Sequence, residues 1–362
     1  MNAMAIQGIG LVGGFGCGLE DFAAALAGGS VPTRPAAFAG GELPALLADT
    51  APLTRFVDKR ALRRIDHFSR LALLGAHLAL EDAGLPDLER ARLGLIVATG
   101  YGATATTFAF LDTVLDGGDA LASPTHFSSS VHNAAAAHTA ILLGITGPNL
   151  TVSQFELSVP TALLAAQSWL AEGRVDAVLL GGVDEACAVL RYCRHRFFPE
   201  TSDLIRPFDF DRQSAVPGEG AAFFLLTADS GTARYGRITE VRQGNARVRP
   251  PLLDAAPLYL LGADGHRECG ANYPRHLPAD ARCAAHAPVY GSLPAGPAFD
   301  LAVAALACRD GRLPPPPVGS GAAQALQGRD LCCLKFGRGG DYGLIRVVRE
   351  MAAGVGERNG PS

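Results

Sequence analysis

The stretch Asn149–Gly182, which reads NLTVSQFELSVPTALLAAQSWLAEGRVDAVLLGG, decides the fold class of this chain. Its first five residues predict a strand, and the Ala- and Leu-rich segment 158–170 predicts a buried helix with Ser158 as its N-cap. Pro160 is tolerated in the first helical turn, and Gly173 can end the helix. A second strand is predicted at 175–181. A strand, a tight turn, a buried helix and another strand are typical of an α/β fold.

The turn Gln154–Leu157 joins the first of these strands to the buried helix. Many α/β enzymes place a nucleophile at such a turn, because the N–H groups and the dipole of the helix stabilise negative charge there. This chain has Glu156 in the turn. We expect the helix N-terminus to keep its carboxylate ionised.

Similar apolar runs alternate with helical patterns along the rest of the chain. A helix buried on most sides is predicted over 60–84, where Gly84 ends it. The segment Gly8–Gly13 spells G-x-G-x-x-G, but no acidic residue lies between Ser30 and Gly40 to bind a ribose. We therefore interpret it as a first strand that enters a glycine-rich turn, and not as a dinucleotide site. The other predicted strands are 5–12, 92–98, 220–227, 236–242, 257–261, 330–336 and 342–348.

The composition excludes several classes of protein. Of the 362 residues, 48% are hydrophobic and 18% are charged, which is enough to form a large buried core. The net charge of -4 predicts no nucleic-acid partner and no binding to an anionic membrane. No Lys or Arg precedes Arg34, and no apolar run approaches the ~18 residues of a membrane span. We therefore expect a cytoplasmic protein with no signal peptide and no membrane span.

Cysteine, histidine and carboxylate spacing gives no sign of a metal site. The eight cysteines form no C-x-x-C pair, and no histidine has a carboxylate at metal-ligand spacing, so we expect reduced thiols and no metal. Chemistry that needs an amine has two candidates, Lys59 and Lys335. The pairs Asp184-Glu185 and Asp209 with Asp211 could indicate carboxylate catalysis, but we favour loop capping and pairing with nearby arginines.

Five segments occur in an order that resembles the β-ketoacyl synthase branch of the thiolase superfamily. The resemblance implies a thiolase-like α/β fold with two pseudo-duplicated halves in an α-β-α-β-α layered arrangement. We place these halves at 1–230 and 231–350 and expect the polar tail 351–362 to fray. The resemblance also implies an obligate dimer, no bound cofactor, and acyl groups delivered on the phosphopantetheine of an acyl carrier protein. The segments are Gly8–Gly10 with the later Phe15-Gly16, Gly147–Val152, Gly181–Asp184, Arg206–Arg212 followed by Val216–Gly220, and Phe336–Gly340.

The chain departs from this family at each catalytic position. The family's T-V-D-T-A-C-S-S motif aligns with Thr151–Ser158, which puts Glu156 where the nucleophilic cysteine belongs. Asp264 falls at the first histidine position, although a shift of two residues would recruit His266. Ser292 falls at the second. The intact catalytic set is therefore absent, and independent condensation is not expected.

The chain keeps the scaffold motifs of the family but lacks the nucleophile. In this respect it resembles the chain-length factor, the inactive half of a heterodimer with a cysteine-bearing ketosynthase. The resemblance implies that the chain shapes the acyl tunnel in bacterial type II fatty acid or polyketide biosynthesis. The run His126–Asn133 looks most like the aryl polyene type. One alternative is a β-ketoacyl synthase or malonyl decarboxylase with an atypical site that uses Glu156 and His266. A second is a carrier-protein or lipid-binding module outside any condensing complex.

Three further groups of residues are candidates for binding roles. Four apolar side chains that precede the central helix could line an acyl tunnel, and the alternative is ordinary core packing. A basic cluster could be a docking patch for the carrier protein, and the alternative is a solvated helix face. The glycine-rich loop near the end of the chain belongs to the family resemblance. The tunnel candidates are Phe108, Phe110, Phe127 and Leu111, the basic cluster is Arg191, Arg194 and His195, and the loop glycines are Gly337, Gly339 and Gly340.

Overall fold

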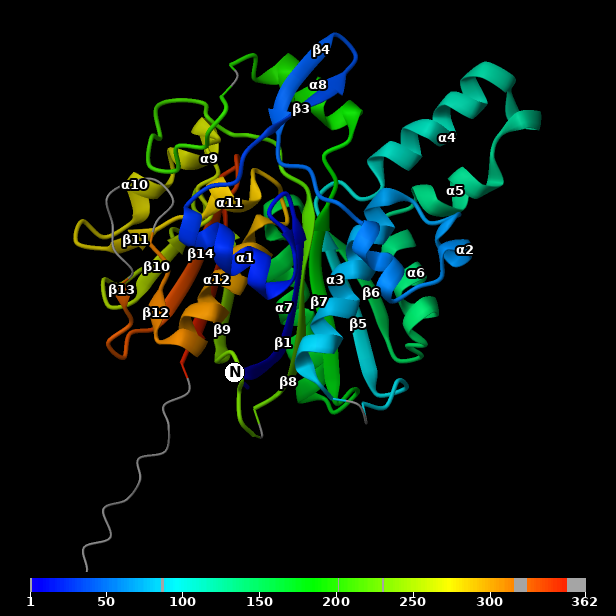
Figure 1. Cartoon of the computed structure of the whole chain (residues 1–362). Coiled ribbons are helices and arrows are strands. Elements are labelled where there is room, and N and C mark those ends of the chain that lie inside the picture. The colour runs from blue at the N-terminus through cyan, green and yellow to red at the C-terminus, as the bar shows by residue number, and fades with distance from the viewer. Residues whose placement is uncertain (1, 86–87, 201, 230, 316–323, 350–362) are drawn as a thin grey trace, which may run out of the picture.

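The computed structural model describes residues 2–85, 88–200, 202–229, 231–315 and 324–349 (Figure 1). In these residues the core of the fold is an 11-stranded mixed sheet. Its strands are β1 (Met4–Gly13), β2 (Gly16–Cys17), β5 (Leu93–Thr99), β6 (Asn149–Ser153), β7 (Ala177–Asp184), β8 (Gly220–Ala228), β9 (Arg237–Asn245), β10 (Leu258–Leu261), β11 (Arg282–Ala284), β14 (Leu331–Phe336) and β15 (Asp341–Val348). Two small pairs lie apart from it: β3 (Arg34–Phe38) with β4 (Gly41–Ala45), and β12 (Arg312–Leu313) with β13 (Gln324–Ala325).

The large sheet consists of two halves with the same topology. The first half has the strand order β6-β5-β7-β8-β1, and the second has β11-β10-β14-β15-β9. Numbered along the chain, both orders are 3-2-4-5-1, with the first two neighbour pairs parallel and the last two antiparallel. The halves join where β1 pairs with β9 near Met4. This repetition confirms the thiolase-like fold with two pseudo-duplicated halves, and the domain boundary predicted at 230 lies between β8 and β9.

Two helices lie between the half-sheets, and other helices cover the outside (Figure 1). The central helices α7 (Ser158–Ala171) and α12 (Gly296–Asp310) each contact strands of both halves. On the outer face of the first half, α3 (His67–Ala83) packs on β1, β7 and β8. These contacts produce the predicted α-β-α-β-α arrangement. The helical residues of α12 are buried from Gly296 to Cys308, as expected for a helix covered on all sides.

The remaining helices are shorter or lie at the surface. Figure 1 shows α4 and α5 projecting from the body of the molecule beside the first half-sheet. The α-helices are α1 (Gly18–Gly28), α2 (Lys59–Leu62), α4 (Thr104–Gly117), α5 (Pro124–Ser130), α6 (Ala134–Leu143), α8 (Ala188–Phe197), α9 (Arg267–Gly270), α10 (Tyr273–His276) and α11 (Ala287–Tyr290), and the 3-10 turns are η1 (Ala51–Arg55), η2 (Asp119–Leu121) and η3 (Phe155–Leu157).

Each strand predicted from the sequence is present close to its expected bounds, and Gly8–Gly13 belongs to the predicted first strand, which enters a turn at Gly14. These residues lie inside β1. A Cβ atom on Gly10 would lie 2.0 Å from the carbonyl oxygen of Gly75 in α3, and one on Gly8 would lie 2.4 Å from that of Ala79. The glycines therefore allow the strand and the helix backbone to approach closely.

Two helix starts differ from prediction. The predicted helix 60–84 is divided into α2 and α3, because Asp66 caps α3 by accepting from the N–H of Ser69 at 2.9 Å. Ser158 is the first residue of α7 and does not cap its N-terminus. The predicted tail 351–362 lies outside the described residues.

Candidate functional site

The turn that leads into α7 is held by the hydroxyl of Ser158. Its Oγ accepts from the N–H of Gln154 at 2.8 Å and lies 2.8 Å from the carbonyl oxygen of Thr99, to which it can donate. Phe155 has a φ of 47°, in the left-handed region that non-glycine residues rarely adopt. The turn is thus a sharp, tightly held connection, and Glu156 lies at its centre in η3.

A cavity of about 360 Å³ lies beside this turn, and it brings together residues far apart in the sequence. Its volume is in the range of small-molecule sites in proteins. All three positions predicted from the motifs contribute to its wall, as does His266. Among the lining residues are Glu156, Cys193, Arg194, Asp264, His266 and Ser292.

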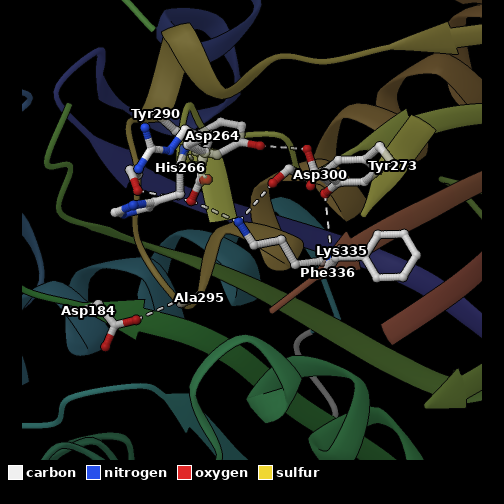
Figure 2. A network of polar contacts seen from close by, with 12 residues as sticks. Asp184, Asp264, His266, Tyr273, Tyr290, Ala295, Asp300, Lys335 and Phe336 are labelled. Atoms are coloured by element: carbon white, nitrogen blue, oxygen red, sulfur yellow. Dashed lines mark hydrogen bonds and ion pairs between the residues drawn. The ribbon is translucent and has the colours of Figure 1, made fainter. Parts of the chain in front are cut away.

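Behind the cavity wall, Asp264 belongs to a buried ion pair with Lys335 (Figure 2). The Nζ atom of Lys335 lies 2.8 Å from Asp264 Oδ2 and donates to the carbonyl of Gly262, also at 2.8 Å. Ser292 Oγ donates to the same carboxylate at 2.9 Å. Burial is the largest single influence and would raise the pKa of Asp264, but the charges of Lys335 and His266 and the hydrogen bonds from Lys335 and Ser292 together outweigh it, and the pKa falls to about 2. Asp264 is therefore a paired carboxylate, and the shift of register that would recruit His266 is not needed to explain the site.

A second carboxyl group, Asp300, belongs to the same network. Tyr290 donates to Asp300 Oδ1 at 2.6 Å, and Asp300 is 1% exposed. Burial raises the pKa of Asp300 to about 7, although the hydrogen bond from Tyr290 and the charge of Lys335 act in the opposite direction. The ammonium group of Lys335 therefore lowers the pKa of two acidic side chains, Asp264 and Asp300.

The surroundings of Glu156 act against the ionisation of its carboxyl group. Burial raises the pKa of its carboxyl, and the charge of Lys335 only partly opposes that effect. The expectation of an ionised carboxylate considered only the helix N-terminus, whereas α7 begins two residues later and burial acts against the ionised form. A Cβ atom on Gly337 would lie 3.3 Å from Glu156 Oε2, so the glycine-rich loop packs closely against this side chain.

Residues 18–231 match the sequence model described as Beta-ketoacyl synthase, N-terminal domain. The chain belongs to the β-ketoacyl synthase family. It is 30% identical over 195 residues to a 3-oxoacyl-[acyl-carrier-protein] synthase 2 of Synechocystis sp., covering 51% of this chain and 47% of that protein. It is 33% identical over 188 residues to Nodulation protein E of Rhizobium sp., covering 50% of this chain and 46% of that protein. The aligned part spans about half the length of these relatives.

Solved structures of other β-ketoacyl synthases share the fold over nearly the whole chain. The ishigamide ketosynthase/chain length factor has a TM-score of 0.81 at 21% identity, covering 97% of this chain and all of that one. A structure described as a type II polyketide acyl-carrier protein in complex with its ketosynthase bound to the hexaketide has a TM-score of 0.77 at 16% identity. The match covers 96% of this chain and 100% of that one. At these identities the likeness concerns the fold.

The apolar tunnel candidates lie on the projecting part of this synthase fold and do not line the cavity. Phe108 is 43% exposed, Leu111 is 43% exposed and Phe127 is 58% exposed, and no residue of α4 is buried. Phe110 stacks at an angle on Phe127, with ring centroids 5.3 Å apart. Phe108, Leu111 and Phe127 are therefore not core residues in the chain by itself, whereas Phe110 is half-buried, and a tunnel role stays a prediction.

The basic side chains of α8 do not all point toward solvent. Arg194 lines the cavity and donates to the carbonyl of Ala215, and burial lowers its pKa to about 10. Arg191 donates to the carbonyl of Ala37 in β3 at 2.7 Å. His195 stacks on Phe38, with ring centroids 5.0 Å apart. The three side chains do not share one solvent-facing surface, and carrier-protein docking on them stays a prediction.

The interpretation of Asp184 as a structural carboxylate agrees with the geometry. It accepts from Thr99 Oγ1 at 2.7 Å, from the N–H groups of Gly100 and Tyr101 at 2.9 and 3.1 Å, and from the N–H of Ala295 at 2.8 Å. These bonds tie the end of β5 to the segment before α12. Burial nevertheless raises the pKa of Asp184 to about 6.

Sequence reasoning missed the pairing of Lys335 with Asp264 and the presence of Cys193 in the cavity wall. Lys335 was identified as a possible amine, but its partner lies 71 residues away along the chain, in a segment with no visible pattern. In the described ranges, no cluster of three or more His, Cys, Asp or Glu side chains could hold a metal ion. Nor does any helix in the same ranges have the length and apolar character needed to span a membrane.

Proposed function

We propose that this chain is a chain-length-factor-like partner of a cysteine-bearing β-ketoacyl synthase in bacterial type II fatty acid or polyketide biosynthesis. One observation carries the proposal: the turn that should present a thiolate presents the carboxyl group of Glu156 at the cavity. A protonated carboxyl group is not a nucleophile, and an ionised one would give a mixed anhydride in place of a thioester. The cytoplasmic location and the aryl polyene type of product are part of this proposal.

Asp264, Ser292 and Cys269 do not offer a replacement for the lost catalytic set. Asp264 accepts hydrogen bonds from Lys335 and from Ser292, so neither Asp264 nor Ser292 is free to hold a malonyl carbonyl. Burial raises the pKa of Cys269 to about 12, so that nearby thiol is not a thiolate. Loss of a nucleophile or its helper typically lowers a rate on the order of 10⁴ to 10⁶-fold.

The surface of the first half supports pairing with a second subunit. β6 is the outer strand of the sheet, and its five residues are exposed or half-buried. Beside it α4, α5 and α6 present large apolar side chains to solvent, as does the Glu156 turn. An unpaired edge strand with a neighbouring apolar surface is typical of a protein–protein interface. The apolar side chains include Phe108, Leu115, Phe127, Ile141 and Phe155.

In this role the chain would contribute walls to a tunnel that receives acyl groups from the phosphopantetheine of an acyl carrier protein. The candidates on α4 and α5 fit such a role once a partner covers them, because they already form an apolar face near the Glu156 turn. No bound cofactor is needed, since the partner would supply the cysteine and histidines.

Co-expression with a cysteine-bearing synthase encoded nearby tests the proposal. We expect a stable 1:1 complex and a chain that aggregates or self-associates poorly by itself. A stable homodimer that ignores the synthase would refute the subunit role.

The enzyme alternative has its own test on the same preparation. The chain is incubated with malonyl- and acyl-loaded carrier protein, and the proposal expects neither a covalent mass increase nor release of carbon dioxide. Carbon dioxide release that disappears in Glu156→Gln would establish the decarboxylase in its place.

A further inference from the structure

The start of α4 is held by a carboxyl group from another element. The N-cap of α4 is Ala103, which offers no side-chain acceptor, and the first turn of the helix contains no acidic residue. The N–H of Ala105 donates instead to Glu185 Oε1, at 2.7 Å, and Glu185 directly follows β7. Glu185 thus caps α4 from the end of a strand of the large sheet.

The helix that Glu185 caps belongs to an arm that projects from the body of the molecule. We call α4, α5 and their connection, residues 104–130, the arm (Figure 1). No residue of α4 is buried, and its main neighbours in the described structure are α5, η2 and α8, with no strand of the large sheet among them. A movement of α4 would therefore leave the core intact, and its attachment is sensitive to the bond at its base.

The carboxyl group of Glu185 is buried without an ion-pair partner. Glu185 is 4% exposed, and no ion pair to it is present in the ranges that the structure describes. His67 could oppose its charge, but His67 Nε2 is already bonded to Glu219 Oε1, at 2.9 Å. Burial therefore raises the pKa of Glu185 to about 7. The charges of Asp66 and Glu219 act in the same direction, and the bond from Ala105 and the charge of His67 act against it.

Three neighbouring groups can also titrate. Burial would lower the pKa of His67, but the hydrogen bond and the charge of Glu219 raise it. Burial raises the pKa of Cys187, just before α8, so its thiol stays neutral near pH 7. Burial also raises the pKa of Asp184, whose bonds hold the chain before α4, to about 6. All three groups are kept when Glu185 alone is replaced, so a variant at that position separates its effect from theirs.

We propose that Glu185 is a proton-dependent latch for the arm: its neutral carboxyl group holds the start of α4, and its ionisation releases the arm. A neutral carboxyl group accepts from the N–H of Ala105 through its carbonyl oxygen and tolerates burial. An ionised one is penalised in the closed arm but not in an opened arm, where water reaches it. Because the pKa is higher in the closed form than in water, a rise in pH must favour the opened form. Only the consequence for a partner that covers the arm rests on the proposed function.

Hydrogen exchange of the full chain at low micromolar concentration tests the latch without a partner. Exchange of the α4 amides is measured by mass spectrometry at pH 6 and pH 8 and corrected for the pH dependence of the chemical exchange rate. A pKa of about 7 in the closed form and of 4.5 in water predicts that the opening constant of α4 rises by up to about tenfold over this range.

In Glu185→Gln the amide oxygen still accepts from Ala105 but cannot ionise, so we expect the opening constant of α4 to be the same at both pH values. Glu20→Gln is the matched control, because Glu20 lies exposed in the first turn of α1, and it should keep the rise in α4. A constant that does not rise in the unmodified chain, or a rise that survives in Glu185→Gln, overturns the inference. The first of these outcomes is decisive even if the variant does not fold, and neither depends on whether the chain forms a 1:1 complex.

Discussion

Replacing Asp264 by asparagine should destabilise the protein, because it leaves the ammonium group of Lys335 buried without an opposite charge. The Lys335 side chain is 4% exposed, and that of Asp264 is 8% exposed. Asparagine has nearly the same size and still accepts a hydrogen bond, so the substitution changes the charge more than the packing. Lys335 would keep its bond to the carbonyl of Gly262.

Two arguments bound the size of this effect. The fall in the pKa of Asp264 from 3.8 to about 2 corresponds to about 2 kcal/mol in favour of folding. Removal of one partner from a buried ion pair typically costs about 3 to 5 kcal/mol. We expect Asp264→Asn to lower the free energy of unfolding by about 2 to 5 kcal/mol at pH 7. Because the folded pKa is depressed, this contribution is present above pH 3.8 and is lost as the pH falls toward 2, so the variant should lack that acid-dependent loss.

Urea unfolding followed by circular dichroism measures the effect, with each protein compared in the same form, alone or in its complex. Glu81→Gln is the matched control, because Glu81 pairs with Arg55 at 3.1 Å where both side chains are about half exposed, and its loss should cost less than ~1 kcal/mol. The double variant Asp264→Leu with Lys335→Met should be more stable than Asp264→Asn, since no buried charge remains. If Asp264→Asn costs no more than Glu81→Gln, the reasoning is refuted.

Three further outcomes are expected. Phe127→Asp should weaken binding to the partner synthase at least about tenfold in calorimetry but leave urea unfolding of the chain unchanged, because this side chain is 58% exposed. The raised pKa of Asp300, about 7, means that ionisation penalises the folded state, so stability should fall as the pH rises from 4 to 7, by up to about 4 kcal/mol, and Asp300→Asn should lack this fall. Gly10→Ala should cost about 3 kcal/mol, because its Cβ would lie 2.0 Å from the carbonyl oxygen of Gly75, whereas Gly28→Ala, which meets nothing within 4 Å, should be neutral in the same unfolding assay.

Much of the fold could be predicted from local pattern, because buried strands and helices in this chain are continuous apolar runs between glycines. What failed depends on contacts between distant segments. Gly8 and Gly10 lie in a strand that was predicted, yet their function is to admit the backbone of α3, which no local rule reveals. Phe108 and Phe127 look like core residues, yet they lie on helices that project from the body.

The position of the candidate site could be predicted from the sequence, but the charge and the pairing of its residues could not. The motif alignment placed Glu156, Asp264 and Ser292 in one site, and all three line one cavity. The alignment could not show that Lys335 neutralises Asp264, because the lysine reaches the site from β14. Nor could it show that burial raises the pKa of Glu156, because that burial comes from segments distant in the sequence.

The charges around the cavity are satisfied from within the chain, and this distinguishes the site from one prepared for catalysis. A condensing site keeps its thiolate and its hydrogen-bond donors available for the substrate. These groups find their partners only when the acyl group binds. Here Asp264 is paired with Lys335, and burial favours the neutral form of Glu156. A cysteine at position 156 would meet the same burial, which favours the thiol over the thiolate and which the charge of Lys335 only partly opposes. Recovering the nucleophile alone would therefore not recover the reaction, and the departure from catalysis involves the electrostatics of the whole cavity.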